Sequence, residues 1–336
     1  MNKENRVLEV LGDVMLPQSD RSLKDLNLIR NVEVTNGHVK VTLASTALNP
    51  STRDWVESSV HTALAGFPEF EHAELAFTEV LPKDLNKIDY RVAVMSGKGG
   101  VGKSLITGLL AVYLRRKGKK VGILDADITG PSIPRMFGID GHPAGSESGI
   151  LPVPAKTGIE IMSINLLLSN QDDAVIWRGP LIARAIQQFW EEVLWGNLDY
   201  LLVDLPPGTA DAPLTVMQSI PLSGVVVALT PQDLTAMVVR KAVRMAGQMN
   251  VPILGVVENM SYFLVPDSGK RIDIFGMSRG MEMARTANAP LMAQLPLDPE
   301  LARLCDAGTI ETYDAQALDD LGKGFVEAMK VLGATD

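Results

Sequence analysis

The feature that most constrains this chain of 336 residues is the stretch 91–104. It begins with a short apolar run that is typical of a buried strand, and a glycine-rich turn follows. The next segment, 105–114, repeats its apolar residues at helical spacing. Four residues of the stretch fit the pattern G-x-x-x-x-G-K-S/T, namely Gly97, Gly102, Lys103 and Ser104. The stretch therefore predicts a strand, a phosphate-binding loop and a helix.

This spacing suits a triphosphate for physical reasons. Only glycines let the backbone wrap so closely that several N–H groups point at one phosphate chain. The helix N-terminus adds unpaired N–H groups and the positive end of its dipole. Lys103 is expected to reach the β- and γ-phosphate oxygens and Ser104 to bind Mg²⁺, so the loop predicts ATP and Mg²⁺ as ligands. The residues expected to line the nucleotide are Gly97, Lys98, Gly99, Gly100, Val101, Gly102, Lys103 and Ser104.

Composition narrows the classes of function. Apolar residues make up 46% of the chain and charged residues 21%, which is ordinary for a globular protein. The net charge of −9 argues against broad nucleic-acid binding, and no apolar run reaches the roughly 18 residues that a membrane helix needs. The polar N-terminus lacks the apolar core of a signal peptide. We therefore expect a cytoplasmic protein that binds neither membrane nor nucleic acid.

Residues 1–82 are predicted to form a small α+β domain. The expected elements, in chain order, are a helix at 20–28, strands at 28–35 and 38–44, a helix at 51–64 and a strand at 72–80. Asn36 and Gly37 separate the first two strands and are a strong hairpin signal, and Ser51 is the expected helix cap. Pro82 and a run of charge mark a linker at 83–89, and residues 90–336 form the second domain.

From residue 90 onward, strand-like and helix-like segments alternate, which predicts a mostly parallel, doubly wound α/β sheet. Strands are expected at 120–124, 159–164, 199–204, 225–229, 253–258 and 291–295, and helices at 181–194, 234–249, 279–287 and 316–332. Residues 138–154 are rich in glycine and proline and are expected to be loop. Ligands of such sheets bind beyond the carboxyl ends of the strands, so polar residues there are site candidates.

Carboxylates stand at the ends of two of these strands. Asp125 and Asp127 follow the first, and one is expected to support Mg²⁺ while the other orients the attacking water. The alternative is a turn with a helix cap. Asp204 closes an apolar run in the Walker B pattern, near the expected Mg²⁺ shell, and its alternative is a strand-end cap. Two prolines follow, and Gly208 is expected to bring a backbone N–H to the γ-phosphate.

Three further residues allow two interpretations each. Asn259 follows the strand at 253–258, where its amide could read adenine or serve as an ordinary turn asparagine. Lys98, the second lysine of the loop, is from the residues alone most simply a solvated side chain. Cys305 is the single cysteine, so an intrachain disulfide is excluded. A lone cysteine in a helical stretch is more often a small core residue than a ligand.

The order of these motifs resembles that of a known family. The sequence Lys-Gly-Gly-x-Gly-Lys-Ser at 98–104 resembles the deviant P-loop of the MinD/ParA-like ATPases. Together with the stretches 125–132, 177–180, 199–211, 258–263 and 296–299, it makes residues 88–336 resemble the Mrp/ApbC branch of that class, the iron–sulfur cluster carriers. The layout of the first domain is similar to the small domain often fused ahead of these carriers.

The resemblance implies an ATP-hydrolysing homodimer that carries a 4Fe–4S cluster to apo-proteins, or that works with assembly factors. It implies that Lys98 crosses the dimer interface to the partner's nucleotide and that Asp127 positions the attacking water. With Lys103, these are the expected catalytic residues. It also implies that Asn259 reads adenine, while Ser104 and Asp204 remain the expected Mg²⁺ site.

The chain departs from the family where the cluster would be held. In the family, Ser-Tyr-Phe is followed by x-Cys-Pro-x-Cys-Gly, whereas residues 264–269 are Leu-Val-Pro-Asp-Ser-Gly. Val265 and Ser268 thus stand in place of the cysteines. A bridging cluster needs two thiolates from each chain, and Val265 has no ligand atom while a serine oxygen is a hard, poor ligand. Two interpretations remain. The first is a family member that retains ATP-driven dimer switching and a role in cluster delivery or assembly, with ligands from a partner as one option. The second is an ATP-dependent switch that regulates or positions a partner protein and holds no cluster.

Overall fold

The computed structural model describes residues 3–17, 19, 21–67, 72–127, 130, 132–167, 179–209, 211–232, 235–266 and 268–334. The stretch 177–178, expected to precede a helix, lies outside them. The chain forms two compact units. The first consists of Met1–Ile88, His142–Pro154 and Gln188–Leu198, and the second of Asp89–Gly141, Ala155–Gln187 and Asp199–Asp336. The first unit therefore includes two segments that lie far beyond residues 1–82 in the sequence.

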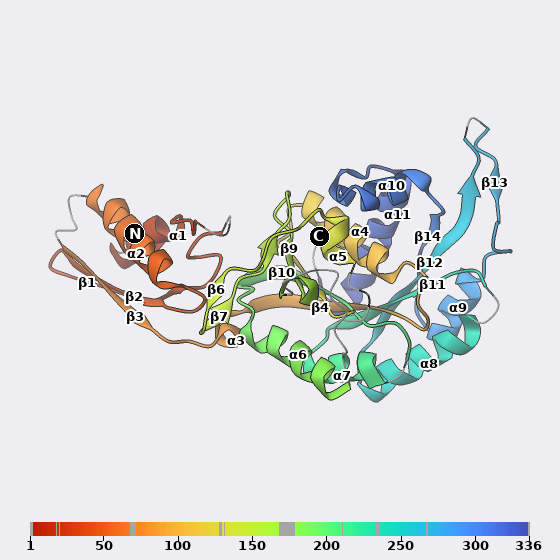
Figure 1. Ribbon diagram of the computed structural model, residues 1–336, viewed down its shortest axis with the longest axis horizontal. Coiled ribbons are helices and arrows are strands. Elements are labelled where there is room, and N and C mark those ends of the chain that lie inside the picture. Colours follow the sequence, from red (N-terminus) through yellow and green to blue (C-terminus); the bar gives the residue numbers. More distant parts are fainter. Residues whose placement is uncertain are drawn as a thin grey trace. The chain divides into compact units, whose positions relative to one another are not determined.

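The first unit is built on a three-stranded sheet in the order β1-β2-β3. β1 (Ile29–Thr35) and β2 (His38–Ala44) are antiparallel, and β3 (His72–Thr78) pairs with β2 in parallel register. The turn between β1 and β2 has φ of 52° at Asn36 and 84° at Gly37, the left-handed conformation that this dipeptide favours. α1 (Lys3–Gly12) and α2 (Pro50–Ala65) lie on one face of the sheet and share its apolar core (Figure 1).

The helix predicted at 20–28 is wrong, since residues 23–27 form turns. Arg21 holds this stretch in place, because its guanidinium donates hydrogen bonds to the carbonyl oxygens of Trp195, at 2.5 Å, and Asp25, at 2.9 Å. Such long-range contacts, which no local pattern reveals, hold a loop where apolar spacing suggests a helix. The helix that does form is α1, and it buries Val7 and Leu11.

α2 is capped by Asn49 rather than by Ser51. The Asn49 side chain accepts from the N–H of Thr52 at 2.9 Å, and Pro50 occupies the first turn, where a missing N–H costs nothing. The expected linker contains one short helix, α3 (Pro82–Leu85). The predicted loop at 138–154 holds only three two-residue strands: β6 (Gly145–Ser146), β7 (Gly149–Ile150) and β8 (Val153–Pro154).

The second unit contains a large sheet whose strands follow the order β13-β12-β11-β4-β10-β5-β9, with β14 beside β12. Its strands are β4 (Lys87–Ser96), β5 (Val121–Asp125), β9 (Glu160–Ser163), β10 (Asn197–Asp204), β11 (Gly224–Leu229), β12 (Ile253–Leu264), β13 (Arg271–Ile272) and β14 (Leu291–Pro296). β4 with β11, β11 with β12, and β5 with β9 and β10 pair in parallel, whereas β12 and β13 form an antiparallel hairpin. This confirms the predicted mostly parallel α/β architecture.

Helices cover both faces of this sheet (Figure 1). They are α4 (Lys103–Arg116), α5 (Ile133–Met136), α6 (Gly179–Glu192), α7 (Asp211–Ser219), α8 (Thr235–Gln248), α9 (Gly280–Ala287), α10 (Pro299–Asp306) and α11 (Gln316–Met329). Short 3₁₀ turns occupy Ile164–Leu167, Ile310–Thr312 and Lys330–Leu332. The central strands are buried on both faces, which is why they are continuous apolar runs in the sequence.

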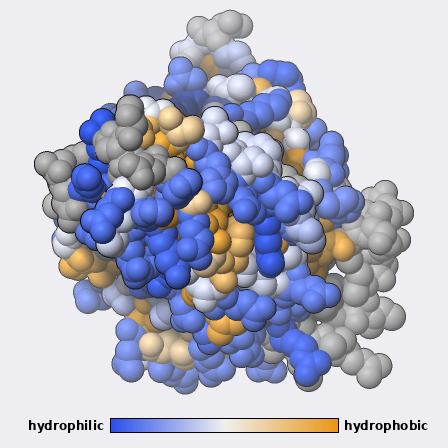
Figure 2. Space-filling model, turned by 90° about the vertical axis from the view of Figure 1, so that its left-hand side faces the viewer, coloured by the Kyte–Doolittle hydropathy of each residue, from blue (hydrophilic) through white to orange (hydrophobic). Residues whose placement is uncertain are grey.

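The surface fits the composition of the chain. On the face shown in Figure 2, hydrophilic side chains predominate and apolar ones form small separate patches. Among the helices that the structure describes, none is both long enough and apolar enough to cross a bilayer.

Candidate nucleotide-binding site

The loop between β4 and α4 has the backbone that a phosphate cradle requires. Gly100 and Gly102 have φ of 79° and 83°, a left-handed conformation that glycine adopts at little cost. A Cβ atom added at Gly99 or Gly100 would meet no other atom within 4 Å, so space remains beside the loop. α4 begins at Lys103, and its first N–H groups have no partner within the helix.

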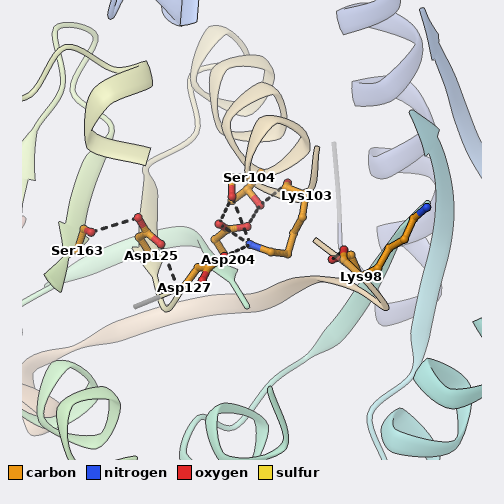
Figure 3. A network of polar contacts seen from close by, with 9 residues as sticks. Lys98, Lys103, Ser104, Asp125, Asp127, Ser163 and Asp204 are labelled. Carbon is orange, nitrogen blue, oxygen red and sulfur yellow. Dashed lines mark hydrogen bonds and ion pairs between the residues drawn. The ribbon is translucent and has the colours of Figure 1, made fainter. Parts of the chain in front are cut away.

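Lys103 and Ser104 converge on Asp204, the last residue of β10 (Figure 3). Lys103 Nζ lies 2.7 Å from Asp204 Oδ2, and Ser104 Oγ donates to the same oxygen at 2.5 Å. Asp204 is fully buried and Lys103 is 5% exposed, so water screens the pair little. A hydroxyl beside a carboxylate is the donor set that Mg²⁺ prefers, and Mg²⁺ takes few protein ligands when phosphates supply the rest. The residues present therefore fit a Mg²⁺–nucleotide complex.

Thr107 is a site residue that sequence reasoning missed. It is buried one turn after Ser104, and its hydroxyl donates to the second carboxylate oxygen of Asp204 at 2.9 Å. Residues three apart lie on the same face of a helix, so the spacing places Thr107 beside Ser104, but only the folded structure shows that it meets Asp204. Both oxygens of Asp204 are thereby held by hydroxyls of α4.

Asp125 ends β5 and Asp127 follows it; both lie next to this cluster, because Asp125 pairs in register with Asp204. Asp127 Oδ2 lies 3.5 Å from Lys103 Nζ. Asp125 instead accepts from Ser163 Oγ at 3.1 Å and from the N–H of Asp127 at 3.2 Å. Figure 3 shows the same division. Asp127 is thus the carboxylate of this pair that faces the P-loop lysine, and Asp125 is held on the side of β9.

Burial raises the pKa of Asp125 from 3.8 to about 8. The negative charges of Asp204 and Asp127 add to this rise, while Lys103 and the hydrogen bond from Ser163 oppose it. At neutral pH Asp125 is therefore mostly a neutral acid, packed beside Asp127 and Asp204, which share one lysine.

This pKa predicts how stability changes with pH. The folded chain binds a proton at Asp125 that the unfolded chain releases above pH 3.8, so Asp125 makes the protein less stable as pH rises from 3.8 to about 8. The slope from this group is at most about 1.4 kcal/mol per pH unit. Asp125→Asn, which resembles the neutral acid, is expected to flatten the dependence. Urea unfolding of both proteins between pH 5 and 8 tests this, and parallel curves would contradict it.

Lys98 does not join the carboxylate cluster. Figure 3 shows its side chain pointing away from Lys103 and Asp204, and its Nζ contacts Gln232 Oε1 in the loop after β11. Lys98 therefore lies on the side of the phosphate loop that faces away from the carboxylate cluster.

Asn259 lies within β12, so the expectation that a strand ends just before it is wrong. β12 continues to Leu264, and a left-handed φ of 53° at Met260 accompanies a break in its register with β14. Asn259 is buried, and its Nδ2 donates to Val101 O at 3.0 Å. A Cβ at Gly102 would lie 2.1 Å from that nitrogen. The amide therefore braces the phosphate loop, and Gly102 must be glycine for space as well as for φ.

Gly208 has a φ of 99°, and its N–H donates to Ser96 O at 2.9 Å. In this conformation a hydrogen bond therefore joins the loop after β10 to the end of β4. A contact between this N–H and a γ-phosphate, as the sequence predicts, requires the loop to give up that bond.

Glu258 is a second residue that sequence reasoning missed. It is fully buried and accepts from Ser261 Oγ at 2.6 Å, Ser278 Oγ at 2.5 Å, Gln294 Nε2 at 3.0 Å and the N–H of Arg279 at 2.8 Å. Burial by itself raises the pKa of Glu258, but these hydrogen bonds outweigh it and the net pKa is lowered. The charged carboxylate thus joins β12, β14 and the start of α9, next to Asn259.

The residues in place of the family's cysteines lie in the β12–β13 hairpin, which projects from the sheet (Figure 1). The N–H of Val265 donates to Lys270 O at 2.9 Å, and the N–H of Gly269 donates to Val265 O at 3.0 Å. Ser268 is exposed, and its Oγ accepts from the N–H of Lys270 at 3.3 Å. The turn is formed, but it offers one hydroxyl and no thiolate, so these residues do not fit an iron–sulfur cluster.

Cys305 does not replace the missing pair. It lies in α10, half-buried, and burial with the nearby charge of Asp306 raises its pKa to about 11. At neutral pH it is a thiol, not the thiolate that a cluster needs. In the part of the chain that the structure describes, no group of three or more His, Cys, Asp or Glu side chains is arranged to hold a metal ion.

Two families match the chain. Residues 87–330 match the family described as "ParA: NUBPL iron-transfer P-loop NTPase", and residues 4–75 match "Iron-sulfur cluster assembly protein". A Synechocystis relative named "Iron-sulfur cluster carrier protein" is 38% identical over 336 aligned residues, which cover 94% of this chain and 95% of the relative. A relative of the same name from Methanocaldococcus jannaschii is 45% identical over 72% of this chain and 84% of its own length.

Two solved structures of nucleotide-bound proteins are similar to this chain. A nucleotide-binding protein from Archaeoglobus fulgidus in complex with ADP is 49% identical to this chain, with a TM-score of 0.64, over 71% of this chain and 94% of its own. The septum site-determining protein MinD from Pyrococcus horikoshii, complexed with Mg-ADP, has a TM-score of 0.54 over 74% of this chain and 98% of its own. At 19% identity it shows the fold alone.

Proposed function

The chain belongs to the family of ParA-type NUBPL iron-transfer P-loop NTPases, and we propose that it is an ATP-hydrolysing homodimer that works in iron–sulfur cluster assembly. The observation that carries the proposal is the convergence of Lys103, Ser104 and Asp204 beside a left-handed glycine loop. A buried lysine held against a carboxylate at the head of a helix is positioned to exchange that partner for phosphate oxygens.

Each residue of the site has one proposed task. The backbone of the loop 97–102 binds phosphate oxygens, and Lys103 neutralises charge on the β- and γ-phosphates. Ser104 and Asp204 hold Mg²⁺, which when bound screens the negative charge of the phosphates. Asp127, 3.5 Å from Lys103 Nζ, accepts a hydrogen bond from the attacking water and orients it. Asn259 reads adenine, and its bond to Val101 O links that contact to the phosphate loop.

The proposed homodimer gives Lys98 its task. Its side chain points away from Lys103 and Asp204, and we propose that its ammonium acts on a nucleotide bound by a facing copy. Large apolar side chains exposed on the β12–β13 hairpin and the following loop, which monomers rarely gather, also support a protein partner there: Leu264, Ile272, Ile274, Phe275 and Met277. The proposed partners are a second copy and apo iron–sulfur proteins or assembly factors.

The division into a first domain at 1–82, a linker at 83–89 and an ATPase domain at 90–336 is part of the proposal. The family matches at 4–75 and 87–330 support it. We propose that the first domain presents partners to the ATPase, as its match to an assembly family suggests.

A second candidate follows from the hairpin. With Val265 and Ser268 in place of two cysteines, the dimer would lack the four thiolates of a bridging cluster. In this alternative the chain is an ATP-dependent switch that binds and releases a partner protein and never holds a cluster itself.

Anaerobic reconstitution of the intact protein with iron and sulfide tests whether the chain itself can hold a cluster. A carrier that finds other ligands would retain about four irons per dimer, with absorbance near roughly 400 nm. A cluster-free switch would retain no iron after desalting and would still hydrolyse ATP. We expect the second result, because the described hairpin offers no thiolate. An absence of both iron and ATP hydrolysis would contradict both candidates.

A further inference from the structure

A second cavity lies in the ATPase unit, at the edge of the sheet opposite the phosphate loop. It has a volume of about 500 Å³ and is lined from α4, β10, α11 and the turn before β5. The phosphate loop begins at the carboxyl end of β4, whereas this cavity lies where α4 ends and β5 begins. α4 has 14 residues, so about 21 Å of helix separates the two places.

The floor of the cavity is aromatic. Tyr113 and Tyr200 are only 5% and 4% exposed and line it together with Leu114 and Val326. Tyr113 can occupy this place because Gly322 of α11 has no side chain: a Cβ there would lie 2.1 Å from the Tyr113 ring. The floor is therefore apolar, and little of either ring is exposed.

The rim of the cavity is basic. Lys117, Lys119, Lys323 and Lys330 line it, and Glu327 is the one acid among the lining residues. Glu327 pairs with Lys330 at 2.8 Å, and Lys117 Nζ lies 5.3 Å from the centre of the Tyr113 ring. Within the described ranges, no carboxylate forms an ion pair with Lys117, Lys119 or Lys323.

This concentration of positive charge is unusual in a chain whose net charge is −9. The negative end of the α4 dipole accounts for Lys117, which caps that helix. It does not account for Lys323, which lies in the interior of α11. Like charges gathered at one cavity repel one another, and an anion that enters the cavity relieves that repulsion.

We propose that this cavity is a second anion site, which binds a nucleoside phosphate independently of the phosphate loop. Its volume is that of a small-molecule pocket, several times larger than a single phosphate needs. The phosphates reach the ammonium groups of the rim, and the base occupies the rest of the cavity beside Val326. Inorganic phosphate would fill only part of this volume, so the cavity favours a larger anion.

Calorimetric titration of the full chain with ADP and Mg²⁺ tests the proposal. We expect two classes of site per chain, the weaker with a Kd between about 10 μM and 1 mM. Lys103→Ala removes only the tighter class, so the two sites are distinguishable. Lys117→Ala/Lys323→Ala weakens only the second class, by about tenfold or more. The matched control, Lys156→Ala/Lys241→Ala, removes two exposed lysines elsewhere in the same unit and leaves both classes unchanged.

A further variant separates a shaped site from general attraction to lysines. Val326→Trp keeps every charge but fills the cavity, so it is expected to abolish the weaker class while the tighter class and the melting temperature report an intact fold. A single class of site up to about 5 mM ADP would overturn the proposal. It would also be overturned if the weaker class survived Val326→Trp, since binding would then need surface charge alone.

Discussion

Lys103→Ala is expected to abolish tight binding of Mg·ATP, with affinity reduced by about 100-fold or more. The ammonium is the cation that α4 supplies at the phosphate loop, and it lies 2.7 Å from a fully buried carboxylate. Without this ammonium, the negative phosphates would be repelled by the nearby carboxylates of Asp127 and Asp204. Equilibrium titration with a fluorescent ATP analogue and Mg²⁺ measures the loss.

The same substitution has a cost in stability. It leaves the buried Asp204 with hydrogen bonds from Ser104 and Thr107 but without its ion-pair partner. Removing one member of a buried pair commonly costs a few kcal/mol, and we expect about 1–3 kcal/mol here because the two hydroxyls remain. Thermal unfolding measured beside the titration shows whether the variant is folded under the conditions in which binding is lost.

Lys98→Ala is the matched control, because it removes a lysine from the same loop. Its side chain points away from the carboxylates, so ATP binding to the isolated chain is expected to change by no more than about twofold. If Lys98 acts in the partner's site, hydrolysis by the dimer falls while binding persists. Normal Mg·ATP binding by Lys103→Ala would show that the phosphate loop is wrongly assigned.

Val265→Cys/Ser268→Cys is expected to create a four-cysteine cluster site in the proposed dimer. The turn that carries the two positions is already closed by hydrogen bonds between Val265, Gly269 and Lys270, so the substitution supplies ligand atoms to a formed hairpin. A dimer of this variant has four thiolates. After anaerobic reconstitution it should retain about four irons per dimer and absorb near roughly 400 nm.

Each single variant supplies half of these ligands and is expected to lose its iron on desalting. Adding Cys305→Ala to the double variant should change nothing, since that thiol is half-buried with its pKa raised to about 11. If the double variant kept no iron while still hydrolysing ATP, the hairpins of two chains would not face each other. The proposed homodimer, rather than the missing cysteines, would then be the part in error.

The nucleotide-binding loop could be predicted because its chemistry is local. Glycines at 100 and 102 and the Lys103–Ser104 pair lie within a few residues, and their positions along the chain already imply a left-handed turn at the head of a helix. The same holds for the hairpin at Asn36 and Gly37. The helix predicted at 20–28 is wrong for the opposite reason, since Arg21 is held by carbonyls that include Trp195, far away in the chain.

The site as a whole could be predicted only in part, because some of its contacts join residues far apart in the chain. Asp204 could be named from its strand, but nothing local shows that Thr107 holds its second oxygen or that Asp125 becomes a neutral acid. Those properties arise from burial and from charges brought together by neighbouring strands. The sequence predicts Asn259 just after a strand, whereas β12 continues past it and directs its amide to the phosphate loop.

The α/β class, the phosphate loop and the absence of the family's cysteine pair can be predicted from the sequence, because each depends on the identity and spacing of nearby residues. The folded structure is needed to see which carboxylate faces Lys103, where Lys98 points, and that lysines from two helices and a turn surround one cavity. These depend on distances between residues far apart in the chain, which packing of the sheet and helices sets and local spacing does not.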